Sequence, residues 1–163
     1  MLPDELTEPA AAIAERLKSR GQTLAVAESA AGGLISAALL TVAGASAFYR
    51  GGLVIYTREG ANELLAGVRP PAAGTRGASE PFARWLADSA AAKLDADWGI
   101  GETGASGPTG NPYGDPAGHA WVAVHGPEGR SEARNLLTGS ADRERNMELF
   151  AAAGLALLLE NLS

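Results

Sequence analysis

The spacing of apolar residues along the chain separates helical segments from strands. Apolar residues recurring every three or four positions, together with helix-stop signals, predict five helices, over residues 3–20, 30–42, 59–65, 80–94 and 142–162. Shorter runs rich in apolar or β-branched residues predict five strands, over residues 23–27, 48–56, 98–101, 119–125 and 130–137. The last two strands are joined by Gly-Pro-Glu-Gly at 126–129, which is a hairpin signal.

The order of these elements predicts the fold class. The order α-β-α-β-α-α-β-β-β-α mixes helix–strand alternation with a hairpin, so we predict a three-layer α/β/α sandwich with a mixed sheet. Gly51 and Gly52 interrupt the second strand and predict a bulge or a close backbone approach there. We find neither a repeat nor a linker, and 163 residues suit one domain. We therefore expect a single domain over residues 1–163.

Composition and charge exclude several classes of function. The chain has no cysteine, which excludes disulfides, thiolate catalysis and cysteine-ligated zinc. Hydrophobic residues make up 46% and the net charge is −6, so the chain is neither disordered nor basic enough to make nucleic acid the obvious partner. The sequence has no secretory signal pattern and no apolar run of about 18 residues. We expect a cytoplasmic protein without a membrane partner.

The first segment with chemical potential is Glu-Ser-Ala-Ala-Gly-Gly at 28–33, between a strand and a helix. Ser29 would project its hydroxyl from the carboxyl end of the strand. The N-terminus of the following helix would offer free N–H groups to an anion or an oxyanion. Gly32 and Gly33 would let a substrate approach the backbone. The alternative is that Ser29 only caps the helix, a position that serine favours.

The second segment is a glycine-rich loop over residues 104–118, between two predicted core strands. Its glycines can present consecutive N–H groups to a phosphate or a carbonyl. It is not a phosphate-binding loop of the Walker type, because no Gly-Lys-Ser/Thr follows. An ordinary connection is the alternative, although loops of this length are usually functional or disordered. The binding candidates at this loop are Thr103, Gly104, Ser106, Gly107, Thr109 and Gly110.

The third segment begins the last helix, where Arg143 can clamp a phosphate or polarise a carbonyl. The alternative is a solvated helix start, with Asp142 as the cap and Glu144 matching the helix dipole. The two histidines, His119 and His125, have no acidic neighbours at metal-ligand spacing. We interpret each as a packed or surface residue, although His119 lies beside the glycine-rich loop. No metal site is expected.

Taken together, these segments resemble the CinA C-terminal domain family, which includes nicotinamide mononucleotide (NMN) deamidases. The resemblance covers nearly the whole chain, and its matching stretches are AVAESAAGGLIS at 25–36, GASAFYRGGLVIY at 44–56, TGASGPTG at 103–110 and GHAWVA at 118–123. It implies a hydrolase that converts the carboxamide of NMN to a carboxylate and releases ammonia. It also implies a small-molecule nucleotide ligand, no metal or cofactor, and a homodimer.

The resemblance further implies roles for individual residues. A serine nucleophile is activated by a lysine and assisted by a tyrosine, while an arginine near the last helix holds or polarises the substrate. By position, the nucleophile corresponds to Ser29, the tyrosine to Tyr56 and the arginine to Arg143. The hydroxyl of the glycine-rich loop corresponds to Thr103, with Ser106 as a near alternative.

The lysine of the family is missing. It lies five residues after the tyrosine, where this chain has Ala61, or Asn62 if the gap moves by one. A serine hydroxyl is a weak nucleophile until a neighbouring group takes its proton. Glu28, Glu59 and His119 are the remaining candidate bases.

Two hypotheses therefore stand. The chain is an amidohydrolase that uses Ser29 with a different base, or an altered homologue that binds a pyridine-nucleotide-like ligand. A pure interaction domain is a third possibility, but the glycine-rich loop argues against it. Two smaller departures from the family are Ala31, where threonine is usual, and Asp115, where lysine is common.

Overall fold

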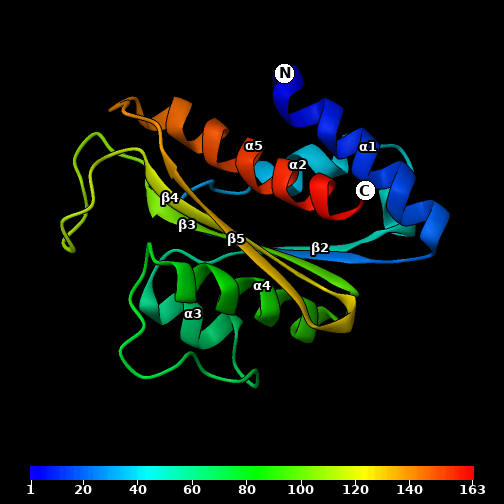
Figure 1. The fold of residues 1–163 in the computed structure, drawn as a ribbon, viewed down its shortest axis with the longest axis horizontal. Helices are drawn as coiled ribbons and strands as arrows, with labels where there is room; N and C mark the ends of the chain where they lie inside the picture. The colour runs from blue at the N-terminus through cyan, green and yellow to red at the C-terminus, as the bar shows by residue number, and fades with distance from the viewer.

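Five strands form one sheet that is covered by helices on both faces (Figure 1), in a computed structural model that describes residues 1–163. The strands are β1 Leu24–Glu28, β2 Tyr49–Val54, β3 Trp98–Ala105, β4 His119–Gly126 and β5 Arg130–Leu137. The helices are α1 Asp4–Arg20, α2 Leu34–Leu40, α3 Arg58–Leu64, α4 Glu80–Leu94 and α5 Arg143–Asn161. The predicted three-layer sandwich is confirmed, with α1, α2 and α5 on one face and α3 and α4 on the other.

The strand order places a ligand-binding position at one edge of the sheet. The order is β2-β1-β3-β4-β5, with β1 parallel to both β2 and β3, and with β4 antiparallel to β3 and β5. The chain leaves β1 through α2 on one face and reaches β3 through α4 on the other (Figure 1). The border between β1 and β3 is therefore a topological switch point. Open α/β sheets bind ligands at such a point, outside the carboxyl ends of the strands.

The two faces of the sheet are packed differently. On the α1, α2 and α5 face, 25 buried residues form the main hydrophobic core. On the α4 face the helix approaches β3 so closely that a Cβ at Gly99 or Gly101 would lie 2.1 Å from a carbonyl oxygen of the helix. Glycine is therefore required at both positions. This close approach accounts for part of the chain's high content of small residues.

Two predicted element boundaries are wrong by four residues, whereas the others agree within two residues, and both lie at the switch point. Helix α2 begins at Leu34 rather than at residue 30, because Gly32 and Gly33 adopt left-handed backbone conformations that interrupt a helix. Strand β3 continues to Ala105, four residues past the predicted end, because its last residues pair with β4. The loop after β3 is correspondingly shorter.

The predicted irregularity in β2 is confirmed. The pairing with β1 skips one residue between Tyr49 and Gly51, which forms a bulge. A Cβ at Gly52 would lie 2.3 Å from the Ser36 hydroxyl oxygen of α2, so the backbone also approaches α2 closely there. The middle of β2 therefore lies against the first turn of α2.

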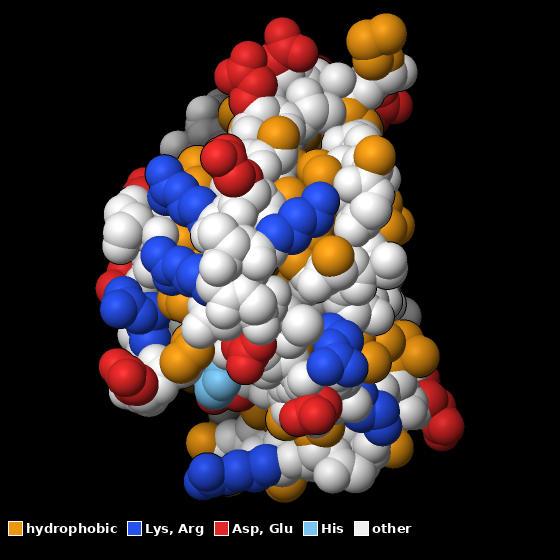
Figure 2. All heavy atoms as spheres, turned by 90° about the vertical axis from the view of Figure 1, so that its right-hand side faces the viewer, with side chains coloured by type: hydrophobic (Ala, Val, Ile, Leu, Met, Phe, Trp, Pro, Cys, Tyr) orange, Lys and Arg blue, Asp and Glu red, His pale blue; other side chains and the backbone are white.

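One end of the molecule is seen in Figure 2, opposite the loop that follows β3. Lysine and arginine side chains on this end are separated by acidic, hydrophobic and neutral ones, so they form no continuous basic surface there. None of the helices combines the length and apolarity that a membrane crossing requires.

Candidate active site

The turn after β1 presents the hydroxyl of Ser29 without an internal partner. Ser29 is half-buried, and its Oγ forms no hydrogen bond within the chain. The N-cap of α2 is Gly33, which has no side chain to cap the helix. The interpretation of Ser29 as a helix cap is therefore wrong, and the hydroxyl is free to react or to bind a ligand.

The start of α2 is held by a buried carboxylate instead. Glu28 is fully buried and accepts hydrogen bonds from the backbone N–H groups of Gly33, Ile35 and Ser36, at 2.9, 3.1 and 2.9 Å. It also accepts from the Ser36 hydroxyl at 2.9 Å. Burial raises the pKa of Glu28, although these hydrogen bonds oppose the rise.

A second buried carboxylate holds the serine itself. Oε2 of Glu102, on β3, accepts hydrogen bonds from the backbone N–H groups of Ser29 and Ala31, both at 2.9 Å. Together with Glu28, this residue occupies the N–H groups that the sequence suggested for an anion or an oxyanion. That expectation is wrong for the N–H groups of residues 29, 31, 33, 35 and 36, because a substrate oxygen would have to displace a carboxylate to reach them.

The loop after β3 supplies free donors in their place. The backbone N–H groups of Ser106, Gly107, Thr109 and Gly110 donate no hydrogen bond to another group of the chain. All four residues line a pocket at the carboxyl ends of the strands. Unpaired N–H groups beside a pocket can bind a phosphate or a carbonyl oxygen, as the sequence predicts for this loop.

Tyr56 and Arg143 close the same pocket from two other elements. Arg143 donates through Nη2 to the Tyr56 hydroxyl oxygen at 3.0 Å and through Nη1 to the carbonyl oxygen of Gly107 at 2.5 Å. Asp142 caps α5 by accepting from the Arg145 N–H at 3.1 Å, which fixes the first turn of the helix. The helix start is therefore capped, as the alternative interpretation expects, and Arg143 also reaches the pocket. The action of Arg143 on a phosphate or a carbonyl stays a prediction.

The pocket has a volume of about 250 Å³, and Arg143 is its only charged residue. One cation and a row of backbone donors suit an anion or the oxygen of a carbonyl group. Its lining residues are Ala30, Tyr56, Gly104, Ala105, Ser106, Gly107, Thr109, Gly110, Asn111, Pro112 and Arg143.

Most of the predicted site residues meet at this pocket. Ser29 precedes the lining residue Ala30, whereas Gly32, Gly33 and Thr103 are not part of the lining. Thr103 is buried, and its hydroxyl oxygen accepts from the N–H of Ala78 at 3.0 Å. That hydroxyl ties β3 to the segment before α4 rather than facing the pocket.

None of the predicted bases forms a hydrogen bond with Ser29. All the hydrogen bonds that the Glu28 side chain accepts come from α2 and its N-cap, Gly33. His119 is buried, and its Nε2 lies 2.9 Å from the carbonyl oxygen of Ala78, to which it donates. Glu59 is exposed in the first turn of α3, and Ala61 packs its methyl group against the apolar cluster below β1.

Glu102 is the residue that sequence reasoning missed. It is fully buried, and its second oxygen, Oε1, has no hydrogen-bond partner. Burial raises its pKa to about 7, and the nearby charge of Glu28 adds to the rise. An acid among the glycines and apolar residues of β3 was the available signal, since such a strand has no solvated face for it.

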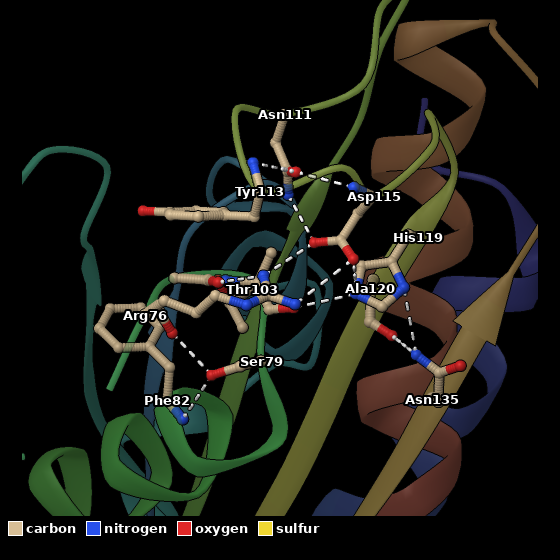
Figure 3. A network of polar contacts seen from close by, with 12 residues as sticks. Arg76, Ser79, Phe82, Thr103, Asn111, Tyr113, Asp115, His119, Ala120 and Asn135 are labelled. Atoms are coloured by element: carbon tan, nitrogen blue, oxygen red, sulfur yellow. Dashed lines mark hydrogen bonds and ion pairs between the residues drawn. The ribbon is translucent and has the colours of Figure 1, made fainter. Parts of the chain in front are cut away.

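A polar clasp holds the far half of the loop (Figure 3). Asp115 forms an ion pair with Arg76 at 2.8 Å and accepts from the Asn111 side-chain amide at 2.8 Å. Oδ1 of Asn111 accepts from the N–H groups of Tyr113 and Asp115, both at 3.1 Å. The Arg76 guanidinium also lies 4.9 Å from the centre of the Tyr113 ring. Asp115, a departure from the family pattern, thus has a structural partner in Arg76.

We expect Asp115→Asn to loosen this loop with little effect on global stability. Burial disfavours ionised Asp115, but hydrogen bonds from Arg76 and Asn111 outweigh it and hold the pKa of Asp115 below its usual range. Its stabilising effect is therefore present above the usual pKa and is lost as the pH falls through the lowered one. Because Arg76 is partly exposed, the free energy of unfolding should fall by no more than about 1 kcal/mol.

Hydrogen exchange measures this effect. Backbone amides of residues 109–116 should exchange faster in Asp115→Asn than in the wild type. Asp88→Asn is the matched control, since it removes an exposed contact with His125 at 2.9 Å on another part of the surface. Equal exchange of residues 109–116 in all three proteins would contradict the clasp.

Comparison with known proteins identifies relatives over almost the whole chain. The sequence matches the family model described as the CinA C-terminal domain over residues 6–162. A CinA-like protein of Anaeromyxobacter sp. (strain Fw109-5) is 40% identical over 149 residues, which cover 91% of this chain. A putative competence-damage inducible protein of Geobacillus kaustophilus is 40% identical over 151 residues, again 91% of this chain. The aligned part is 36% of the length of either relative, so this chain spans about a third of the curated relatives it matches.

Solved structures show the same arrangement of strands and helices. The competence damage-inducible protein A of Klebsiella pneumoniae superposes with a TM-score of 0.87 at 31% identity, covering 96% of both chains. The competence/damage inducible protein CihA of Agrobacterium tumefaciens superposes with a TM-score of 0.89 at 28% identity, covering 98% of this chain and 97% of that one.

Proposed function

This chain belongs to the CinA C-terminal domain family, and from that premise we propose that it is an amidohydrolase acting on the carboxamide of NMN or a related pyridine nucleotide. Ser29 is the proposed nucleophile, with Tyr56 and Arg143 acting on the substrate. The reaction consumes water and releases ammonia together with a carboxylate.

One observation carries this proposal: the free Ser29 hydroxyl stands beside a pocket that is lined by unpaired backbone N–H groups and by a single cation, Arg143. Attack of Oγ on the carboxamide carbon places negative charge on the carbonyl oxygen. The N–H groups of the loop and the Arg143 guanidinium can stabilise that charge. Ammonia then leaves with a proton, and water hydrolyses the acyl-serine.

A second candidate function is supported by Ala61. The position where the family has its lysine carries a methyl group, and the predicted bases form no hydrogen bond with Ser29. General-base assistance is typically worth about 10²–10⁴-fold in rate. The second candidate is therefore a protein that binds a pyridine-nucleotide-like ligand in the same pocket with little or no turnover.

Ammonia release from NMN by the wild type and by Ser29→Ala tests the first candidate. We expect the wild type to release ammonia and Ser29→Ala to fall to the level of buffer, because the nucleophile is gone. Ser46→Ala is the matched control, since Ser46 is exposed and lies in another turn. It should keep the wild-type rate.

Calorimetry with NMN, NAD and ADP-ribose separates the two candidates. Binding without ammonia release above the Ser29→Ala level favours the second candidate. If none of the three ligands binds and no ammonia appears, both candidates fail.

The homodimer and the cytoplasmic location stay predictions. Size-exclusion chromatography with light scattering measures the mass of the protein in solution. A mass of one chain at micromolar concentration would contradict the homodimer.

A further inference from the structure

Two carboxylates lie next to the turn that carries Ser29, and they differ in how many hydrogen bonds their oxygens accept. Glu28 and Glu102 are both fully buried. Glu28 accepts four hydrogen bonds and so resembles a structural cap. Glu102 uses one oxygen, while its Oε1 is buried without any partner. An unpaired buried oxygen costs free energy, so its presence calls for an explanation other than stability.

The location of Glu102 suggests an explanation for its unpaired oxygen. Its two backbone bonds go to Ser29 and Ala31, the residues on either side of Ala30, which lines the pocket. Residues two apart on a strand share a face, so Glu102 lies on the same face of β3 as the lining residue Gly104. The carboxylate is thus directly bonded to the backbone that carries the proposed nucleophile.

We propose that Glu102 is the positioning residue of the serine turn: its ionised carboxylate fixes the backbone of Ser29 and so places the hydroxyl, and proton uptake on Oε1 weakens that hold. The part of this inference that concerns reaction rate rests on the proposed function. Hydrogen bonds to an ionised acceptor are roughly twice as strong as neutral ones. Oε1 is the available oxygen for the proton, because Oε2 already accepts two N–H groups.

The groups around Glu102 make it the first carboxylate of the pair to take a proton as the pH falls. Glu28, on β1, is the charged group that acts on it. Helix α2 has no ionisable residue, the buried residues of α5 are neutral, and β4 pairs Val122 with Glu102. Burial raises the pKa of Tyr49, on β2, and the charge of Glu28 adds to that rise. Because Glu28 accepts four hydrogen bonds and Glu102 two, Glu28 keeps its charge to lower pH.

The test compares the wild type with Glu102→Gln, which keeps an acceptor oxygen but cannot ionise. We expect kcat for NMN to rise with pH in the wild type and to be flat in Glu102→Gln. The two rates should agree at low pH, and the wild type should be about tenfold faster on its high-pH plateau, which corresponds to two strengthened hydrogen bonds. KM should be unchanged, because Glu102 does not line the pocket.

Amide NMR provides a readout that is independent of turnover. The N–H resonances of Ser29 and Ala31 should titrate with the same midpoint as kcat in the wild type and should not titrate in Glu102→Gln. Glu102→Asp, which keeps the charge on a shorter side chain, should keep the titration with a lower kcat plateau. Glu28→Gln is the matched control, and it should move the midpoint to lower pH without abolishing it, because it removes a neighbouring negative charge.

The outcomes separate the inference from the proposed function. A pH-dependent kcat that persists in Glu102→Gln, or Ser29 and Ala31 amides that do not titrate in the wild type, would overturn the inference. If the wild type releases no ammonia, the proposed function fails. Amides of Ser29 and Ala31 that titrate in the wild type but not in Glu102→Gln would still show that Glu102 binds the backbone of this turn in its ionised form.

Discussion

Replacing Ala61 with lysine should increase ammonia release from NMN by about 10²–10⁴-fold, the usual effect of a general base. Ala61 lies five residues after Tyr56, on α3, a helix whose start is fixed by Thr57 accepting from the Gly60 N–H at 3.0 Å. Its side chain is half-buried against an apolar cluster. A lysine stem can lie along that surface while its amine extends outwards. Partial burial would lower the pKa of that amine and favour its neutral, basic form.

Asn62→Lys is the control for this substitution. Asn62 is the exposed neighbour of Ala61 and the alternative position of the family lysine. Helix geometry places adjacent residues about 100° apart, so the two lysines would point in different directions. We expect a gain from Ala61→Lys only, measured as initial rates of ammonia release. If both folded variants match the wild type, a missing base does not explain the wild-type rate.

The fold was predictable because the apolar spacing and the tertiary packing agree along most of the chain. The predicted boundaries of α4 are those of the structure, since Ser79 caps the helix and its inward positions are small or apolar. The start of α2 was not predictable from spacing. Ala30 and Ala31 favour a helix, yet the N–H groups of the turn are bound by carboxylates that burial brings under it.

The site was predictable as a set of segments but not as a set of contacts. Ser29, Tyr56 and the loop after β3 all follow the carboxyl ends of the parallel strands β1, β2 and β3, so they lie at the same end of the sheet. This placement follows from the order of the elements. The contact between Arg143 and Tyr56 crosses 87 positions of the sequence, so it depends on the final packing. Glu102 was missed because an acid in a strand gains meaning only when its burial and its unpaired oxygen are known.

Glu102 should also make the free energy of unfolding fall as the pH rises. Burial raises the pKa of Glu102 from 4.5 to about 7 in the folded chain. Between these values the folded state binds more protons than the unfolded state, so the free energy of unfolding decreases with increasing pH. The stabilising effect is complete below pH 4.5 and is lost as the pH rises through about 7. The full shift corresponds to about 3 kcal/mol.

Chemical denaturation of the wild type and Glu102→Gln from pH 4.5 to 8 measures this loss. The difference in unfolding free energy between the two proteins isolates Glu102, because their other ionisable groups are shared. We expect the wild type to lose about 3 kcal/mol relative to Glu102→Gln over this range. A pH-independent difference would contradict a buried, titrating Glu102. Ionisation of this carboxylate thus lowers stability over the same pH range in which it should raise kcat, a cost that proteins accept at functional sites.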